Sequence, residues 1–490
     1  MKLRSLIIAA VLASFSTGTL AEQPLPELGD ASSATLSEQQ ERTIGNAIMR
    51  EVRTDKDYID DPEIADYINS IGQKLLQQAD PPVPTMDFFV VRDDTINAFA
   101  MPGGHIGVHS ALILLTQNES ELAGVLGHEI THILQKHQAR FLHGQRGATF
   151  TSLAALAVAL LAAKSGGSQA SQVTEAAVAS AGALSMQSQI NYTREHEREA
   201  DRGGILLMQR AGYDPHGMET FFDRMMRANR LNEYKGAPAY LRTHPLTTER
   251  IADMDDRIQQ MPLVLGMTPS SLEYRLTKAR LRVMSMTPGE AVTYFRRELE
   301  SQTVLRPRED VYGLALALRR ARNFDEAYKA VQPLRKDGSH PAFELLAGEL
   351  LADMGRTDEA LGVYRNALRV TPSYRALSYA YYDLLLDRGQ AKRVLAEVDD
   401  SMRILPEDAR LYEIKARACE ATGKPLGQHR AQAEAYFRRG NLARAVEQLE
   451  IAVKTKGSDF YEISSAESRL RELRAQLENE KAAEKALKIS

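Results

Sequence analysis

The first 110 residues alternate between apolar positions at helical spacing and short runs typical of strands. A capping box at residues 36–40 predicts one helix, and apolar residues spaced three or four apart after Pro62 predict a second. Residues 88–91 and 106–108 are typical of strands, with a turn signal at residues 102–104. This pattern predicts an α+β region. An exposed strand edge there either holds a substrate peptide or only completes the core.

An almost continuous apolar stretch occupies residues 148–163 and ends at Gly166 and Gly167, before Ala-rich helix resumes towards Ser188. The stretch predicts a helical hairpin, but it is shorter than the ~20 residues that a membrane span needs. We expect the hairpin to cover the site and to move as a lid. The alternative is peripheral membrane contact by residues 148–188.

From about residue 270 the pattern is helical throughout and repeats itself. Gly355, Gly389 and Gly423 are 34 residues apart, and two prolines recur with the same period, which is that of tetratricopeptide helix pairs. The spacing predicts about four to six such pairs and a polar capping helix at the end. The alternative, a plain helical bundle, needs no fixed period. We expect an all-α tetratricopeptide-repeat solenoid over residues 270–490 whose concave face binds protein.

The N-terminus carries a short apolar run. Lys2 and Arg4 precede it, and small residues follow up to Ala21, a pattern typical of a cleavable secretory signal. No Cys follows the run to carry a lipid, and the run is too short to span a bilayer well. We predict a signal peptide over residues 1–21, cleavage near Ala21 and, because the signal is bacterial in style, export to the periplasm.

Composition excludes some classes of function. The chain of 490 residues is long enough for two or more domains, and its formal net charge of −4 gives no indication of nucleic acid binding. The single cysteine, Cys419, lies in a helical pattern and excludes an internal disulfide. The charged residues are therefore expected to form solvated surface.

The chemistry centres on His128, Glu129 and His132, inside an apolar-periodic segment at residues 119–138. Residues four apart share one helix face, so both imidazoles can bind one metal ion. Neutral imidazole suits Zn²⁺, which lowers the pKa of water, and Glu129 is close enough to take the proton as water attacks a carbonyl. The motif predicts peptide hydrolysis.

A zinc site needs a third protein ligand. The metzincin pattern is excluded because Gln135 and Gln138 stand where it requires Gly and His. Downstream, Glu197 and Asp201 are four apart and share a helix face, so one can bind the metal while the other accepts a hydrogen bond from the far nitrogen of a zinc-bound His, expected to be His128. Glu195 and Glu199 are expected to face elsewhere.

These motifs resemble the M48 family of zinc metalloproteases. The strand and glycine turn at residues 97–106 and a His244-Pro245 motif followed by Arg250 have the family's order. The resemblance covers about residues 30–260 and implies a gluzincin-type α+β domain, which we place at residues 22–265. It also implies one zinc ion per subunit, with His128, His132 and Glu197 as metal ligands and Asp201 as their hydrogen-bond partner.

His244 has two competing roles in this resemblance. It can stabilise the oxyanion of the transition state, with Arg250 assisting, or it can take the fourth position on zinc in a resting state. A purely structural histidine beside Pro245 is the third interpretation. We expect the blocking role to dominate in the resting enzyme.

Two functions remain from the sequence: a secreted zinc endopeptidase, and a chaperone or binding protein that keeps the protease fold as a scaffold. The complete set of metal-site residues favours the endopeptidase. A signal, a soluble M48-like domain and a C-terminal repeat array together resemble envelope proteases of Gram-negative bacteria. That resemblance implies misassembled outer-membrane proteins as substrates and the outer-membrane assembly machinery as a partner of the repeats.

Overall fold

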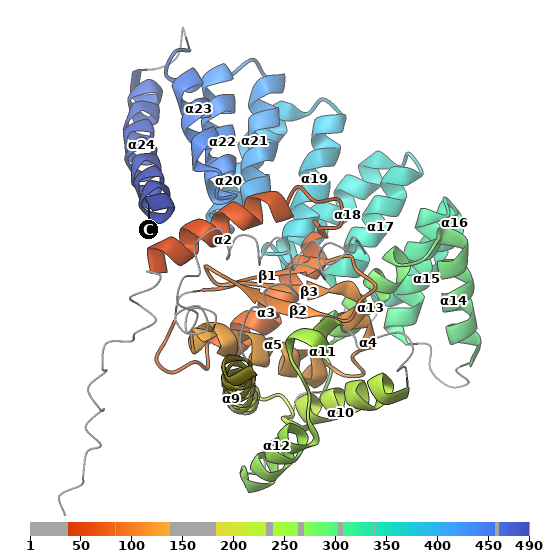
Figure 1. Ribbon diagram of the computed structural model, residues 1–490. Helices are drawn as coiled ribbons and strands as arrows, with labels where there is room; N and C mark the ends of the chain where they lie inside the picture. Colours follow the sequence, from red (N-terminus) through yellow and green to blue (C-terminus); the bar gives the residue numbers. More distant parts are fainter. Residues whose placement is uncertain are drawn as a thin grey trace, which may run out of the picture.

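A computed structural model of the chain describes residues 38–83, 85–137, 183–231, 239–262, 269–301, 307–336, 340–455 and 460–489. Figure 1 shows two regions: an N-terminal region, residues 38–262, that contains the sheet, and a helical array, residues 272–489, that lies beside it. The expected signal peptide and most of the 148–188 hairpin lie outside the described residues. None of the described helices is both long and apolar enough to cross a bilayer.

The sheet of the N-terminal region has three strands, β1 (Asp87–Val91), β2 (Ala98–Met101) and β3 (His105–His109). β3 is central, parallel to β1 and antiparallel to β2, with Phe88 opposite Ile106 and Ala100 also opposite Ile106. The turn signal at residues 102–104 therefore joins β2 to β3. The two runs that the sequence indicated as strands pair in parallel.

Side chains alternate between the two faces of this sheet, as the period of two in a strand requires. Phe88 and Val90 belong to the main core, beneath α3 (Pro62–Leu76) and α5 (Glu119–Leu134). Phe89 and Val91 belong to a smaller core under α2 (Glu38–Val52) on the opposite face. The two helices predicted near the N-terminus thus cover opposite faces of one sheet.

α2 contacts the turn at the end of strand β2. Gly103 has a φ of +80°, which favours glycine, and a Cβ on Gly45 of α2 would overlap the carbonyl of Pro102. Only a glycine at position 45 allows this approach. The helix therefore supports the hairpin that forms the β2 edge of the sheet.

The remaining helices of the N-terminal region lie on the α5 side of the sheet in Figure 1. They are α4 (Ser110–Leu115), α9 (Ala183–Arg210), α10 (His216–Leu231), α11 (Ala239–Thr243) and α12 (Thr248–Gln260). α5 packs against α9 and α10. This packing brings the segment that carries His128 against the segment that carries Glu197.

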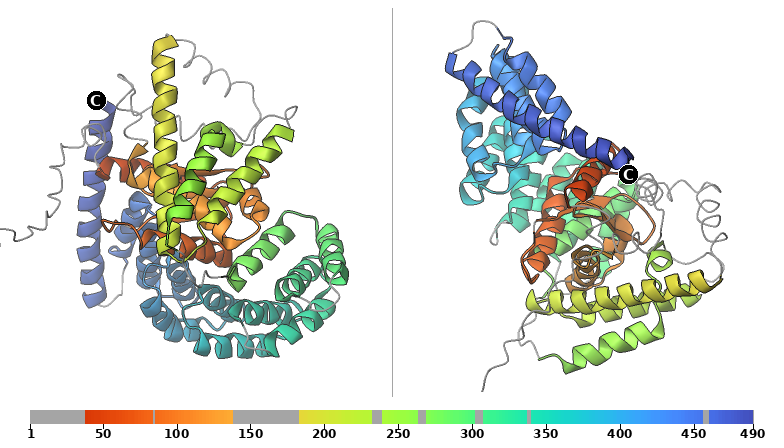
Figure 2. Two further views of the ribbon diagram at one scale, coloured as in Figure 1. Left: turned by 90° about the horizontal axis from the view of Figure 1, so that it is seen from below. Right: turned by 60° about the vertical axis from the view of Figure 1, so that its left-hand side comes forward.

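The helical array is helical throughout its described residues, as the sequence predicts, and its helices follow an arc in the left view of Figure 2. It consists of α13 (Leu272–Met284), α14 (Pro288–Ser301), α15 (Arg308–Arg320), α16 (Phe324–Lys336), α17 (Pro341–Asp353), α18 (Thr357–Val370), α19 (Arg375–Asp387), α20 (Ala391–Ile404), α21 (Ala409–Ala421), α22 (Pro425–Arg438), α23 (Leu442–Ala452) and α24 (Phe460–Ile489). Gly355, Gly389 and Gly423 each follow one of these helices with φ between +67° and +76°. The 34-residue spacing therefore marks equivalent turns.

The array touches the N-terminal region at both of its ends. At the first end, Tyr274 and Leu281 of α13 belong to the main core of the N-terminal region, whereas Ala279 of the same helix belongs to a core of the array. At the other end, α24 packs against α2. The helix α13 is thus shared by two cores.

Candidate metal centre

The metal-site helix α5 begins where the sequence predicts and approaches α9 very closely. The side chain of Asn118 caps its N-terminus by accepting a hydrogen bond from the Glu121 amide. Further along, Gly127 faces Gly204 of α9, and a Cβ on Gly204 would lie 2.9 Å from the backbone nitrogen of His128. The facing glycines let the two backbones approach closely enough for side chains of both helices to reach one point.

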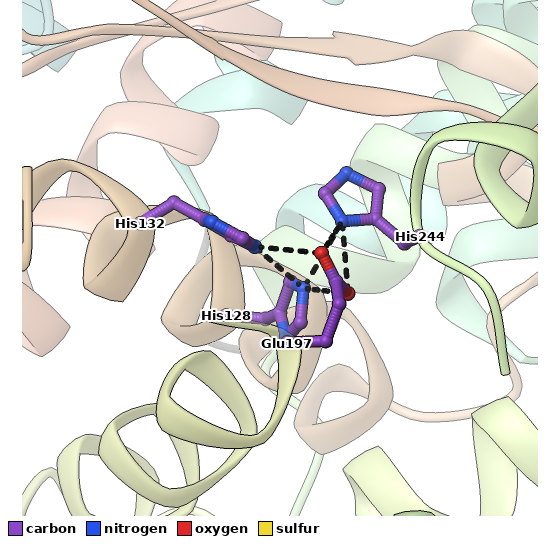
Figure 3. A group of neighbouring side chains, drawn as sticks. All are labelled: His128, His132, Glu197 and His244. Carbon is purple, nitrogen blue, oxygen red and sulfur yellow. Dashed lines mark hydrogen bonds and ion pairs between the residues drawn. The ribbon is translucent and has the colours of Figure 1, made fainter. Parts of the chain in front are cut away.

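Four side chains converge at that point (Figure 3): His128 and His132 from α5, Glu197 from α9, and His244, which follows α11. One ligand atom from each lies within 4.8 Å of the others. His132 and His244 are largely buried, and the side chains of His128 and Glu197 are 0% and 4% exposed. The three predicted ligands and the candidate fourth ligand thus form one cluster.

The spacing of these atoms suits zinc. Nε2 of His128 lies 3.1 Å from Nε2 of His132 and 3.4 Å from Glu197 Oε2, and His244 Nδ1 lies 3.1 Å from Glu197 Oε1 and 3.3 Å from His128 Nε2. A tetrahedral zinc with bonds of about 2.0–2.1 Å separates its ligand atoms by roughly 3.3 Å. Three imidazoles and one carboxylate are also donors that zinc accepts.

Asp201 and Arg250 lie behind His128. Oδ1 of Asp201 is 3.0 Å from His128 Nδ1, and Arg250 binds the same carboxylate through Nε and Nη2, each at 2.7 Å. Arg250 also donates to the Pro245 carbonyl and pairs with Glu197 Oε2 at 3.0 Å. The guanidinium therefore connects the carboxylate behind His128, the cluster residue Glu197 and the segment that carries His244.

These contacts keep both carboxylates ionised. Burial opposes ionisation of Glu197, but His244 and His128 hold its pKa well below the usual value for a glutamate. Burial likewise opposes ionisation of Asp201, whereas His128 and Arg250 lower its pKa. Anionic carboxylates are the form that binds a metal cation or fixes the tautomer of a ligating histidine.

Glu129 lies beside the four ligand atoms without belonging to the set. Its side chain is 1% exposed, and Oε1 accepts no hydrogen bond from the described residues, although His244 Nε2 is 3.5 Å away. A buried carboxylate oxygen without a donor is rare, and it suits a group that receives a proton during a reaction.

The sequence did not single out three neighbours of this cluster. Tyr240, fully buried, stacks its ring on His244 with centroids 4.6 Å apart. His137 contacts His132, and Glu199 contacts His137. Glu199 is not among the four ligand residues, but it is connected to them through His137. Tyr240 lies four residues before His244 on a short helix, a spacing that could have indicated the contact.

The comparisons with known proteins agree with this chemistry. The model of peptidase family M48 matches residues 62–258. The beta-barrel assembly-enhancing protease of Escherichia coli strain K12 is 33% identical over 464 residues, which are 92% of each chain. The chain belongs to the M48 peptidase family.

Two further relatives show how far this M48 peptidase resembles other members. A putative beta-barrel assembly-enhancing protease of Vibrio cholerae is 38% identical over 319 residues, 64% of this chain and 63% of that one. The mitochondrial metalloendopeptidase OMA1 of Schizosaccharomyces pombe is 27% identical over 190 residues, 39% and 52% of the two chains. This M48 peptidase is accordingly a zinc-dependent metalloendopeptidase, with a ligand cluster that fits the metal.

Proposed function

We propose that this M48 peptidase is a periplasmic zinc endopeptidase that removes outer-membrane proteins that fail to assemble. The observation that carries the proposal is the buried Glu129 beside a four-residue cluster with zinc spacing. Outer-membrane proteins as substrates are supported by relatives that are named beta-barrel assembly-enhancing proteases and align with 92% and 87% of the chain. Export is supported by the predicted signal over residues 1–21.

In the proposed reaction His128, His132 and Glu197 would hold the zinc, which would lower the pKa of a water molecule and polarise the scissile carbonyl. Glu129 takes the proton of the attacking water and passes it to the amine that leaves. Asp201 accepts a hydrogen bond from His128 Nδ1, which fixes the tautomer whose Nε2 faces the cluster. Arg250 is a positioning residue: it binds the Asp201 carboxylate and so holds it behind His128.

We further propose that His244 blocks the site in the resting enzyme. Its Nδ1 lies within 3.3 Å of ligand atoms of both His128 and Glu197, so it takes the fourth position of the cluster. A catalytic zinc site keeps that position for water or substrate. His244 must move away before Glu129 can act, and it can then donate to the developing oxyanion.

Substrate is proposed to bind along the β2 edge of the sheet. β2 pairs with β3 on one side only within the described strands, and it packs against α5, which carries Glu129. An extended peptide can add to such an edge through main-chain hydrogen bonds. The contact between α2 and Pro102 holds this edge in place.

The helical array is proposed to be a tetratricopeptide-repeat solenoid that binds substrates or the outer-membrane assembly machinery. The equivalent turns at Gly355, Gly389 and Gly423 support the repeat. Ion pairs between residues 34 apart, such as Arg319 with Asp353 and Asp383 with Arg417, link neighbouring pairs of helices in the same way. Solenoids of this kind present extended concave surfaces to proteins.

The test is metal content by mass spectrometry on the purified full chain, with casein cleavage measured with and without a chelator. We expect about one zinc per subunit, cleavage that the chelator abolishes, and recovery on adding zinc. Protein that binds no zinc and cleaves nothing would contradict the proposal and favour the scaffold function. For the substrate, Glu129→Gln expressed in the periplasm should co-purify with uncleaved outer-membrane proteins that the wild type degrades.

A further inference from the structure

The two zinc-binding histidines of α5 are supported in different ways on their far sides. Asp201 lies directly behind His128, with 3.0 Å between Oδ1 and Nδ1. Behind His132 lies another imidazole instead, with 2.8 Å between the Nδ1 atoms of His132 and His137. The second ligand thus has a hydrogen-bond partner that no motif of the sequence indicated.

The end of α5 turns the chain so that His137 reaches this position. Lys136 has a φ of +50°, a left-handed conformation that is uncommon for a residue with a side chain. The chain therefore leaves the helix axis directly after Gln135, and His137 is 3% exposed. Its ring stacks on His196 of α9, with centroids 4.2 Å apart and 7° between the planes.

The far nitrogen of His137 also has a defined partner. Nε2 of His137 lies 2.9 Å from Oε2 of Glu199, another residue of α9. Glu199, His137 and His132 thus form a chain of two hydrogen bonds that ends at Nδ1 of His132, the ring nitrogen that faces away from the cluster. The carboxylate is 32% exposed, in contrast to Asp201 at 2%.

The positions of the hydrogen atoms in this chain follow from metal binding. When Nε2 of His132 is the ligand atom, it carries no hydrogen, so Nδ1 of the neutral ring does. His132 Nδ1 therefore donates to His137 Nδ1, which places the hydrogen of neutral His137 on Nε2. That hydrogen is donated to Glu199. One assignment of tautomers satisfies every atom in the chain.

We propose that His137 and Glu199 are positioning residues for zinc, holding the ring and the tautomer of His132 as Asp201 holds those of His128. The inference rests on the zinc-binding function of the cluster. Partners behind metal-bound histidines raise ligand basicity and fix ring orientation, and their loss weakens metal binding about 10- to 100-fold. His137 and Glu199 belong to different segments, so together they also bind the end of α5 to α9.

The test is zinc affinity, measured on the full chain by competition with a chromogenic chelator. His137→Ala should weaken zinc binding about 10- to 100-fold. His137→Asn should restore part of that loss, because its amide oxygen can accept from His132 Nδ1. Glu199→Ala should weaken binding less than His137→Ala. Glu195→Ala, an exposed glutamate on the same helix, is the matched control and should leave the affinity unchanged.

A double-mutant cycle separates the chain of hydrogen bonds from two independent effects. Since Glu199 acts through His137, Glu199→Ala should change the affinity in the wild type but not in the His137→Ala background. Equal effects in both backgrounds would overturn the role of Glu199. Unchanged zinc affinity in folded His137→Ala would overturn the role of His137.

Thermal melting of the metal-free and zinc-saturated proteins distinguishes positioning from folding. A positioning role predicts that His137→Ala reduces the rise in Tm on adding a fixed zinc concentration, because that rise depends on affinity. A loss of Tm in the metal-free protein with an unchanged zinc-induced rise would contradict the inference. Wild-type protein that binds no zinc would contradict the proposed function instead.

Discussion

The metal centre and the helical array place their charged groups in opposite ways. In the metal centre the side chains of Glu197, Asp201 and Arg250 are 4% exposed or less, and each contacts another member of the group. In the array, pairs such as Arg319 with Asp353 join successive helix pairs with about 30% of each side chain exposed. Loss of one partner from a buried pair leaves an uncompensated charge, whereas exposed pairs contribute little. Substitutions in the centre should therefore affect the whole protease, and those in the array should act locally.

Removing the proposed base gives the largest expected effect. Glu129→Gln keeps the shape of the side chain but cannot take a proton, so casein cleavage should fall about 10²- to 10⁴-fold. Zinc content and Tm should stay at wild-type values, because Glu129 is not a ligand. Glu249→Gln, whose side chain is 72% exposed, is the control. Undiminished cleavage by Glu129→Gln would show that another group is the base.

Removing the buried arginine tests the contrast in stability directly. Arg250→Ala leaves Asp201 without its guanidinium partner in the interior, and the free energy of unfolding should fall by about 3–5 kcal/mol. Arg257→Ala on the same helix breaks an exposed pair with Asp253 and should cost about 0.5 kcal/mol or less. Urea denaturation of both variants measures the difference. Similar losses in the two variants would remove the distinction between buried and exposed charge.

Two leucines test whether the regions are energetically separate. Leu281 of α13 and Leu350 of α17 are 1% and 0% exposed, but Leu281 packs in the core of the N-terminal region and Leu350 in the array. Each change to Ala should cost about 2–5 kcal/mol. Leu281→Ala should shorten the half-life of cleavage activity on heating. Leu350→Ala should lower the temperature at which the helical signal is lost, with a smaller effect on that half-life. Equal loss of activity in both would show that the two regions unfold as one unit.

The smallest expected effect concerns the resting state. If His244 occupies the fourth position, activity depends on the fraction of molecules in which it has moved away, and His244→Ala should raise the casein cleavage rate about two- to tenfold. Three of the proposed ligands remain in this variant, so zinc should stay bound. Zinc content is measured in parallel. A lower rate with unchanged zinc would show that stabilisation of the oxyanion is the dominant role of His244.

Much of the site followed from sequence because its spacing is local. His128 with His132, and Glu197 with Asp201, are each four residues apart, and a helix converts that spacing into a shared face. The same holds for the turns of the array, where glycines recur every 34 residues. The two N-terminal helices and the strands that the apolar pattern indicates also appear, and α5 ends at Leu134, a few residues before the predicted segment does.

Contacts that depend on the direction of the chain between elements did not follow from sequence. His137 reaches His132 only because Lys136 is in a left-handed conformation, which its residue type does not favour. The parallel pairing of β1 with β3 depends on where the intervening strand β2 lies. Sequence periodicity likewise could not show that α13 contributes to two cores, since it reports that a face is apolar and not what covers that face.

The attachment of the helical array at both ends has a mechanical consequence. A row of stacked helices with one free end can change its curvature easily. Here α13 is fixed in the main core, and at the other end Arg50 and Arg53 of the α2 segment donate to the carbonyls of Gly440 and Arg439. Between these ends, α19 also contacts α3, where Arg375 pairs with Asp66 at 2.7 Å. The curvature of the row is therefore fixed at several points against the N-terminal region. We therefore expect that a protein that bends the row on binding will shift α2 and α3, and, through the contact of α2 with Pro102, the β2 strand that packs against α5.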